Sequence, residues 1–489
     1  MSPDEILLPL AQACAAVRPA GQDDAVGGVR PAAVAVPAST QEAAGLLRAA
    51  SALGLAVVVR GSGTRLHWGN PPERCDLIID TSGLTEIVEH AAGDLVATVQ
   101  AGVRLDELAA VLGRAGQRLA LDPPGGGTIG GVLAAGAAGP LRLRYGTPRD
   151  LLIGITIVRA DGTVARSGGK VVKNVAGYDL GKLFAGSRGT LGLITQATFR
   201  LHPVPAETAY VTAECAAAVD ACQAVAAALG SPATPSAAEI DWPSAGEPVR
   251  VCVALEGSRA GVAERAIALA GLLGPDAAPS VRPEPPAWWG GGPGAQPDGT
   301  VLQVAFWPGD LGVVLAEIRA AALAAGVDPA VGGPAAAGVL YIALPPQLEP
   351  GAVAALVAVL RGAVGHGLPA DSGHRLSQDR QPVIHAKPGA RREPRRLGRR
   401  RPAAGQADRT EVAPTPPEGS AGPAGPAEQV RSAEGPPARA NVTVLHAPLA
   451  VATLIDLFGP VPSLGLMRAV KRQFDPERVL APGRFAGGI

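Results

Sequence analysis

The sequence predicts an α+β protein of two parts, and three observations lead to this fold class. Residues 34–65 have the pattern of a strand, a helix, a second strand and a glycine loop. Two further glycine-rich segments follow before residue 206. Beyond residue 206 the pattern changes to repeated pairs of a strand and an Ala-rich helix. The chain has 489 residues, of which 47% are hydrophobic, so it can form two or three domains with their own cores.

The first unit contains two apolar strands joined by a helix. Residues 34–36 and 56–60 are rich in Val and Ala and predict buried strands. Ser39 or Thr40 can cap the helix between them, and Gly54 ends it. We expect the two strands to pair in parallel, with a loop at the carboxyl end of the second strand.

That loop consists of Gly61, Ser62, Gly63, Thr64 and Arg65. The carboxyl ends of strands are where an α/β sheet receives ligands. Glycines there let consecutive backbone N–H groups converge on an anion, because no Cβ blocks unusual dihedral angles. A pyrophosphate is the natural occupant of such a loop.

A second loop contains a literal G-x-G-x-x-G at Gly125, Gly127 and Gly130, with Asp150 about 20 residues further on. This spacing fits a nicotinamide fingerprint, but that motif should follow a strand and open a long helix. Here two prolines precede it, and Gly136 shortens the helix that follows. A tight turn without a ligand is another alternative. We favour close backbone approach to a flavin diphosphate and ribityl chain.

The third segment, residues 168–203, predicts a turn, a short amphipathic helix, a Gly-Thr-Leu-Gly elbow and an alternating strand. Such an arrangement can hold a large planar ligand. Three separate glycine systems are hard to explain by structure alone, so together they favour a flavin site.

These segments carry a resemblance to a known family. RGSGTRLHWG at residues 60–69, PPGGGTIGGVLAAGAAGPLRLRYGTPRDLL at 123–152 and GGKVVKNVAGYDLGKLFAGSRGTLGLIT at 168–195 closely resemble the FAD-binding PCMH-type domain of the vanillyl-alcohol oxidase superfamily. Within it they resemble the FAD-binding subunits of bacterial glycolate oxidases, and D-lactate dehydrogenases share much of the same pattern. Residues 466–485 are similar to the closing segment of that family.

The resemblance implies a two-subdomain FAD-binding PCMH-type fold with an α+β cap domain. We expect a helical N-terminal segment at 1–29, the FAD-binding domain at 30–206, the cap at 207–365, an insertion at 366–437, and a C-terminal segment at 438–489 that completes the cap and returns to the flavin. Cap strands are predicted at 210–213, 249–253, 301–305 and 339–342, and cap helices at 311–325 and 352–364.

The insertion at 366–437 is rich in Pro, Gly, Ala and Arg and lacks periodicity. It cannot bury enough apolar area to offset the entropy of ordering, so we expect disorder. A basic patch for RNA or anionic lipid, a solvated linker, and translation from a locally shifted reading frame are the alternatives.

The resemblance also implies a set of FAD-binding residues and a non-covalent cofactor. His67 lies outside the first loop, whereas covalently flavinylated relatives carry their histidine inside it. The predicted FAD-binding residues are Gly61, Ser62, Gly63, Thr64, Arg65, Pro124, Gly126, Gly127, Thr128, Gly130, Gly131, Gly136, Asn174, Gly189, Gly192, Ile194 and Arg484.

The catalytic candidates form a second set of residues beside the cofactor site. Oxidation of a 2-hydroxy acid needs a base for the hydroxyl proton and cations for the carboxylate. The candidates for lining the flavin or the substrate are Arg144, Tyr145, Lys173, Asn174, Tyr178 and Arg484.

Histidines do not suggest a metal site. Relatives often carry paired histidines in the cap that bind a metal, and this chain shows no such pair. His202 and His446 stand alone at strands, and the other late histidines fall in or beside the insertion. We therefore expect no metal.

Composition excludes several classes of function. The net charge is zero and aromatic residues make up 3%, so nucleic acid is not an expected partner. No basic leader and no apolar run long enough to span a bilayer are present, which favours the cytoplasm, with the inner membrane reached only through partner subunits.

The cysteines bear on the electron acceptor. The chain has five cysteines, without the C-x-x-C spacing of an iron–sulfur site. Electrons that leave the flavin singly therefore need another chain. We expect an FAD-binding subunit that oxidises glycolate to glyoxylate beside a second flavoprotein subunit and an iron–sulfur subunit. The alternatives are a stand-alone D-lactate or D-2-hydroxy acid dehydrogenase and a non-catalytic subunit that holds FAD as an electron relay.

Overall fold

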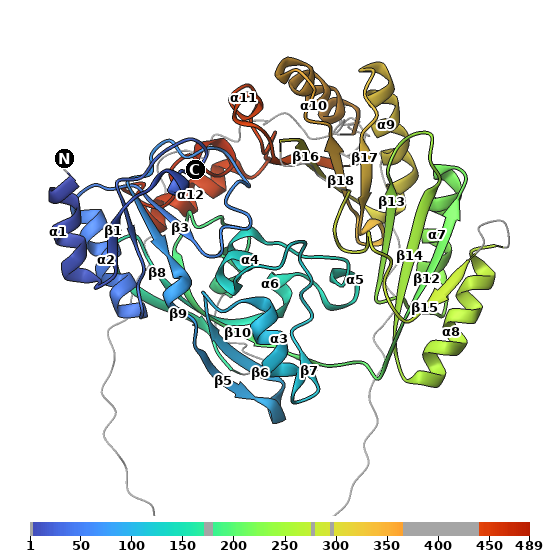
Figure 1. Cartoon of the computed structure of the whole chain (residues 1–489), viewed down its shortest axis with the longest axis horizontal. Coiled ribbons are helices and arrows are strands. Elements are labelled where there is room, and N and C mark those ends of the chain that lie inside the picture. The colour runs from blue at the N-terminus through green and yellow to red at the C-terminus, as the bar shows by residue number, and fades with distance from the viewer. Residues whose placement is uncertain (1–2, 171–178, 275–278, 294–297, 365–439) are drawn as a thin grey trace, which may run out of the picture. The chain divides into compact units, whose positions relative to one another are not determined.

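A computed structural model describes residues 3–170, 179–274, 279–293, 298–364 and 440–489 (Figure 1). These residues belong to one compact unit, and a second unit at 369–435 lies wholly outside them. The predicted insertion at 366–437 and the candidates Lys173, Asn174 and Tyr178 also lie outside the described residues.

The N-terminal sheet is the first layer of the FAD-binding part. Its strands are β1 (Val17–Pro19), β2 (Ala33–Ala35), β3 (Val57–Arg60) and β4 (Leu77–Asp80), in the order β1-β2-β4-β3. Helices α1 (Pro3–Ala13) and α2 (Thr40–Ala52) pack on this part of the chain, and the Ser39 side chain caps α2 by accepting a hydrogen bond from the Glu42 N–H.

The predicted direct pairing of β2 with β3 is wrong, although both strands run parallel as expected. β4 lies between them and pairs in parallel with each. Leu77, Ile78 and Ile79 of β4 are completely buried. A strand with three consecutive buried apolar residues suits the centre of a parallel sheet, where both faces are covered.

A five-stranded antiparallel sheet forms the second layer of this part. Its order is β5 (Ile87–Ala91), β6 (Val96–Gln100), β10 (Leu193–Arg200), β8 (Leu152–Val158) and β9 (Val164–Gly168). The elements around it are α3 (Leu105–Gly113), β7 (Gln117–Arg118), α4 (Ile129–Ala135), α5 (Arg142–Tyr145), α6 (Pro148–Leu151) and β11 (His202–Pro203). Phe199 of β10 is fully buried in the cluster that joins this sheet to α3 and α4.

The amphipathic helix predicted before β10 is instead the short 3₁₀ turn η4 (Leu180–Leu183). Gly181 weakens helix formation, and Gly186, at a φ of +83°, reverses the chain shortly afterwards. The helix that follows the second glycine loop is short as expected, because Gly136 ends α4 in the left-handed conformation.

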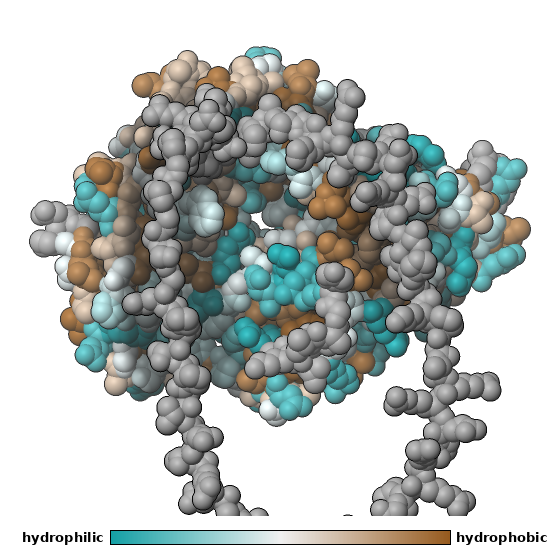
Figure 2. All heavy atoms as spheres, turned by 180° about the vertical axis from the view of Figure 1, so that it is seen from behind, coloured by the Kyte–Doolittle hydropathy of each residue, from teal (hydrophilic) through white to brown (hydrophobic). Residues whose placement is uncertain are grey.

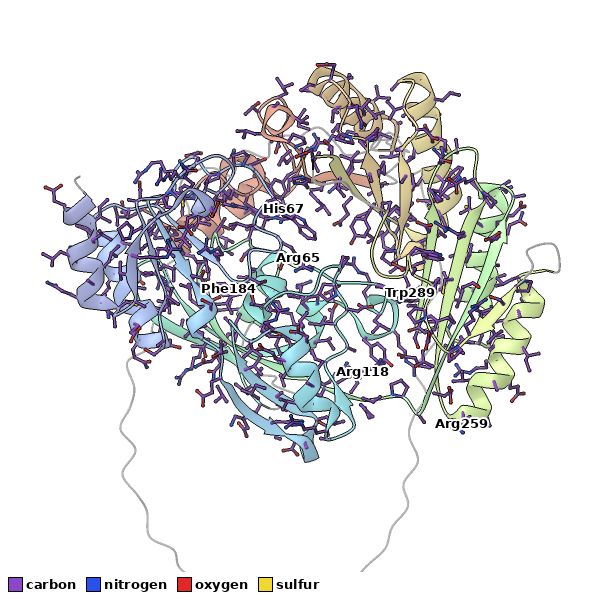
Figure 3. All side chains as sticks on the ribbon, viewed as in Figure 1. Arg65, His67, Arg118, Phe184, Arg259 and Trp289 are labelled. Carbon is purple, nitrogen blue, oxygen red and sulfur yellow. The ribbon has the colours of Figure 1, made fainter. Side chains whose placement is uncertain are left out.

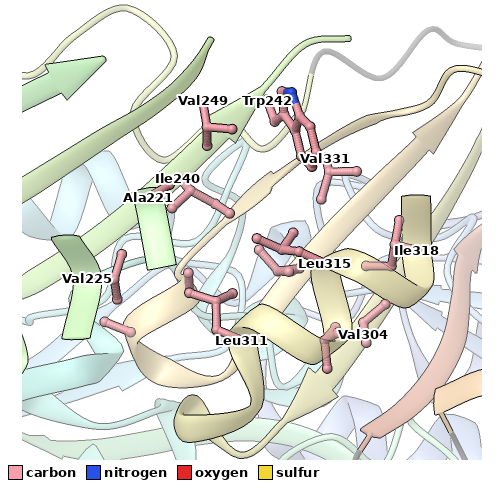
Figure 4. Close-up of a cluster of buried hydrophobic side chains, with 14 of the residues drawn as sticks. Ala221, Val225, Ile240, Trp242, Val249, Val304, Leu311, Leu315, Ile318 and Val331 are labelled. Carbon is pink, nitrogen blue, oxygen red and sulfur yellow. The ribbon is translucent and has the colours of Figure 1, made fainter. Parts of the chain in front are cut away.

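The cap is an eight-stranded sheet covered on one face by helices, which confirms the α+β class. Its order is β15 (Ser280–Arg282), β12 (Glu207–Cys215), β14 (Val249–Gly257), β13 (Ala237–Trp242), β17 (Ala330–Gly333), β18 (Val339–Leu344), β16 (Thr300–Phe306) and β19 (Ala440–His446). The covering helices are α7 (Ala218–Gly230), α8 (Arg259–Leu272), α9 (Leu311–Ala324) and α10 (Pro350–Val364). Figure 4 shows part of the core between them, which includes Leu315 of α9 and Val331 of β17.

The two faces of the cap sheet differ in character. Ile240 and Trp242 of β13 lie in the core under the helices. Because side chains alternate along a strand, Glu239 and Asp241 point to the opposite face. Tyr341 of β18 follows the same rule, since its neighbours in sequence belong to the core. We call this second face the polar face of the cap sheet.

The chain returns from the cap to the first sheet near its end. After α11 (Leu449–Ala452) and α12 (Leu464–Phe474), the Val57 N–H donates to the carbonyl of Val479 at 2.7 Å, and the Ala481 N–H donates to the carbonyl of Val57 at 2.8 Å. The return segment therefore extends the edge of the first sheet at β3.

Hydrophobic and hydrophilic residues are interspersed on the face that Figure 2 shows. Of the helices within the described residues, none has both the length and the apolar character needed to cross a membrane.

Candidate functional site

The glycine segments converge on one cleft. It is lined by the end of β3 and the loop after it, by the start of α4, by the elbow before β10 and by Arg484. The predicted FAD-binding residues in this lining are Gly61, Ser62, Gly63, Thr64, Arg65, Thr128, Gly130, Gly131, Gly189, Gly192, Ile194 and Arg484. Pro124 and Gly136 line two neighbouring cavities instead.

The glycines of the loops serve two different purposes. Gly63 has a φ of +75°, and a Cβ built there would meet no atom within 4 Å, so its hydrogen faces the open cleft. At Gly61 a Cβ would collide with the Thr128 hydroxyl, and at Gly127 it would lie 2.9 Å from the guanidinium of Arg65. Gly63 leaves room for a ligand, whereas the other two let the loops pack against each other.

Arg65 joins the first loop to the second. Its guanidinium donates to the backbone carbonyls of Pro124 and Gly126, the second at 2.7 Å. Arg65 therefore holds the carbonyl of Gly126, and neither Gly126 nor Gly127 lines the cleft. Figure 3 labels Arg65 and His67, which lie in the segment after β3.

Thr128 supplies a polar group that fits a cofactor with hydrogen-bonding groups. The residue is 4% exposed, and its Oγ1 has no hydrogen-bond partner among the described residues. Buried hydroxyls normally have a partner, so an unpaired one in the lining of a cleft indicates a ligand. The open glycine cradle and this hydroxyl together fit the diphosphate and ribityl chain of FAD.

Arg484 brings a buried positive charge into the cleft from the C-terminal segment. It is 4% exposed and donates to the carbonyls of Leu66 and Trp68 at 2.6 and 2.8 Å. Burial lowers the pKa of Arg484 to about 10, so the side chain is still charged at neutral pH.

Two cavities next to the cleft share Trp68 with it and are lined on the cap side by the polar face of the sheet. The residues of the cap sheet in their lining are Val301, Gln303, Tyr341, Thr443, Leu445 and His446. Tyr341 lines both cavities and is 8% exposed. Burial is the main cause that raises the pKa of Tyr341, so its hydroxyl is protonated at neutral pH and can donate.

Two carboxyl groups lie within electrostatic reach of Tyr341, the buried Glu239 and the half-buried Asp122. Burial raises the pKa of Glu239 to about 8, and Glu239 accepts a hydrogen bond from the Gly290 N–H at 2.7 Å. Burial also raises the pKa of Asp122 to about 6. These two acids add protonatable groups close to the cavity wall, and sequence reasoning identified neither of them.

The structure brings together two histidines that the sequence placed apart. The rings of His67 and His446 meet edge to face with centroids 4.7 Å apart, and both line the same cavity. Desolvation, followed by the effect of His446, lowers the pKa of His67 to about 4. Among the residues that the structure describes, no group of three or more metal-ligating side chains comes together.

The candidates Arg144 and Tyr145 line none of these three cavities. Tyr145 donates to Glu256 of β14 at 2.6 Å, and Arg144 donates to Ser236 at 3.3 Å. Arg118 completes the contact by donating to Glu256 at 2.8 Å. These residues join the FAD-binding part to the cap and so position the polar face of the sheet.

Comparisons with known proteins agree with this geometry. Residues 31–168 match the family model described as FAD binding domain. The chain is 41% identical over 178 residues to glycolate oxidase subunit GlcD of Bacillus subtilis, which covers 36% of this chain and 38% of that protein. It is 38% identical over 173 residues to D-lactate dehydrogenase of Archaeoglobus fulgidus, which covers 35% and 38%.

A solved structure extends the likeness of the fold to the cap. The 4-ethylphenol oxidase from Gulosibacter chungangensis superposes with a TM-score of 0.58 at 15% identity, over 74% of this chain and 86% of the other. The regions that match GlcD and the D-lactate dehydrogenase cover less than two fifths of the length of each of those two proteins. The resemblance to the FAD-binding PCMH-type domain is confirmed, and the chain carries an FAD binding domain at residues 31–168.

Proposed function

We propose that this chain is an FAD-dependent oxidoreductase that acts on the CH–OH group of a small 2-hydroxy acid, as the FAD-binding subunit of a complex that oxidises glycolate to glyoxylate. The observation that carries this proposal is the junction between the glycine-lined cleft and the polar cavities of the cap, which share Trp68. A cofactor held in the cleft would have one end beside the cavities that are open to a small polar substrate.

The cleft residues would hold the cofactor by backbone and side-chain contacts. N–H groups of the loop at 61–65 and the Thr128 hydroxyl would bind the diphosphate and ribityl groups. Bound FAD would supply the hydride acceptor, and hydride transfer is the difficult chemical step. Arg484 would place positive charge beside the cofactor.

The cavity residues would orient the hydroxy acid and take up its hydroxyl proton. Tyr341 can donate a hydrogen bond to a carboxylate or hydroxyl oxygen, and Gln303 and Thr443 line the same wall. His67 is neutral above about pH 4, so one of its ring nitrogens is available to accept a proton. Its place in the lining of the cavity makes it our candidate base.

Partner subunits are part of the proposal because the flavin must be reoxidised. The B. subtilis relative is named as a subunit of glycolate oxidase, which supports an assembly. We propose a second flavoprotein subunit and an iron–sulfur subunit as partners. A location in the cytoplasm, with attachment to the inner membrane through those partners, belongs to the same proposal.

The experiment measures flavin content and flavin reduction together. Acid precipitation of the purified chain should release yellow flavin into the supernatant, as expected for non-covalent FAD. Under anaerobic conditions the isolated chain should be reduced slowly by glycolate or D-lactate, and co-expressed partner subunits should copurify and restore turnover. A colourless protein that cannot be reconstituted would contradict the proposal.

A second candidate function has support from the D-lactate dehydrogenase relative. Rapid bleaching of the isolated chain by D-lactate, without partners, would favour a stand-alone D-2-hydroxy acid dehydrogenase. Glycolate and D-lactate differ by one methyl group, which is worth only about 1–3 kcal/mol in a pocket, so both must be tested.

A further inference from the structure

Arg188 is a cation at the cleft to which the proposed function gives no role. It lies between η4 and β10 and lines both the cleft and the neighbouring cavity in which Tyr341 lies beside Gln303 and Thr443. Its guanidinium carbon is 5.6 Å from the ring centroid of Trp68 and 5.5 Å from that of Phe458. Two aromatic rings therefore hold the guanidinium in a defined place.

The positive charge of Arg188 has no carboxylate partner among the described residues. Burial and the nearby guanidinium of Arg484 lower the pKa of Arg188 to about 10, so it is still charged at neutral pH. Within the described part of the chain, the side chain of Arg484 donates to the backbone carbonyls of Leu66 and Trp68 and to no carboxylate. Arg188 is half-buried and Arg484 is buried, and two like charges that are shielded from water near one another cost free energy unless an anion compensates them.

The backbone at Arg188 supports a role in binding. Its φ is +53°, in the left-handed region that favours glycine. Strain of this kind persists where the surrounding structure enforces it, and it is common at ligand sites. Arg478 offers an internal comparison, because it has a φ of +55° but is exposed and paired with Glu73 at 2.8 Å.

We propose that Arg188 and Arg484 together form a binding site for an oxyanion. Both side chains line the glycine-rich cleft, which points to the diphosphate of FAD. Arg188 also lines the cavity of Tyr341, where the carboxylate of a hydroxy acid offers the same chemistry. Guanidinium groups bind both anions through paired N–H donors. This inference rests on the proposed function for the identity of the two ligands.

The first arm of the test compares two flavins. Flavin-free wild type and Arg188→Met are titrated with FAD and with riboflavin, which lacks phosphate, and fluorescence quenching gives the Kd values. If the anion is the diphosphate, the Kd for FAD should rise at least about tenfold and the Kd for riboflavin should not change. The Kd of Arg188→Lys for FAD should lie between those of wild type and Arg188→Met, because lysine keeps the charge and loses the planar donor pair.

The second arm uses oxalate as a non-oxidisable anion. FAD-loaded wild type and Arg188→Met are titrated with oxalate, and the flavin absorbance reports binding. If the anion is the carboxylate, oxalate binding should weaken at least about tenfold while FAD binding stays normal. Arg478→Met is the matched control, since it removes an arginine with the same backbone conformation, and it should change neither titration.

Two outcomes would overturn the inference. One is normal binding of FAD and of oxalate by Arg188→Met with an unchanged melting temperature. The other is an equal loss of FAD and riboflavin binding, which would indicate a structural role. Arg188→Gly relieves the backbone strain and repeats the test if the Met variant is unstable. A wild-type chain that binds no flavin would contradict the proposed function itself.

Discussion

The glycine loops of the FAD-binding part and the polar face of the cap sheet contribute to the same group of cavities by different means. In the loops, the residues that line the cleft are neighbours in sequence, as in the run from Gly61 to Arg65. On the polar face, Gln303, Tyr341 and Thr443 come from three strands and meet only when the sheet has formed. A contiguous loop can be recognised from its residues, whereas a site on a sheet face depends on strand order.

This difference explains how much of the molecule could be predicted. The glycine loops, the cap of α2 by Ser39 and the end of α4 at Gly136 follow from local chemistry, and the sequence predicted each. The insertion of β4 between β2 and β3 was missed, because strand order depends on which strand buries both faces. Arg188 lies inside a predicted motif, but its lack of a carboxylate partner is a property of the folded chain.

The largest effect is expected when a side chain is placed in the glycine-lined cleft. Gly63→Val should abolish FAD binding, because its side chain would enter the open cleft at a φ of +75°. Gly116→Val is the matched control, since Gly116 also has a positive φ, +65°, and open space around it. Flavin absorbance of the two purified variants measures the effect. Equal FAD content would show that the loop is an ordinary turn.

A change on the polar face should affect turnover and leave the cofactor in place. Tyr341→Phe removes one hydroxyl from the cavity wall, so anaerobic flavin reduction by the hydroxy acid should slow by about tenfold or more. FAD content should stay the same. Tyr210→Phe is the control, because Tyr210 packs edge-on against Trp289 and lines none of the three cavities. Equal rates of flavin reduction in the two variants would show that the Tyr341 hydroxyl takes no part in the reaction.

The buried acid of the polar face predicts a pH dependence of stability. The pKa of Glu239 rises from 4.5 to about 8 on folding, so the native state keeps a proton that the unfolded state loses. The free energy of unfolding should therefore fall as pH rises from about 4.5 to about 8 and then level off. In Glu239→Gln this pH dependence should disappear. The free energy of unfolding of the variant relative to that of wild type should therefore increase by roughly a few kcal/mol from pH 5 to pH 9. Urea denaturation at both pH values tests this, and a constant difference would contradict the buried carboxyl.

The smallest effect is expected where the two regions are joined. Tyr145→Phe removes the hydrogen bond to Glu256, but Arg118 still pairs with that carboxylate. The free energy of unfolding should decrease by about 1 kcal/mol, with FAD content unchanged. Thermal melts with and without FAD measure it. A larger loss, or a loss of FAD, would mean that this contact controls the cleft as well as the cap.

The return of the chain to β3 has a consequence for the order of synthesis. The edge of the first sheet is completed by Val479 and Ala481, and Arg484 ties down the carbonyls of Leu66 and Trp68. A nascent chain that stops short of these residues has its glycine loops but neither the pairing on Val57 nor the buried guanidinium. We therefore expect the chain to take up FAD only after the ribosome has released this segment. The yellow colour of bound flavin would then mark chains whose translation has passed Arg484.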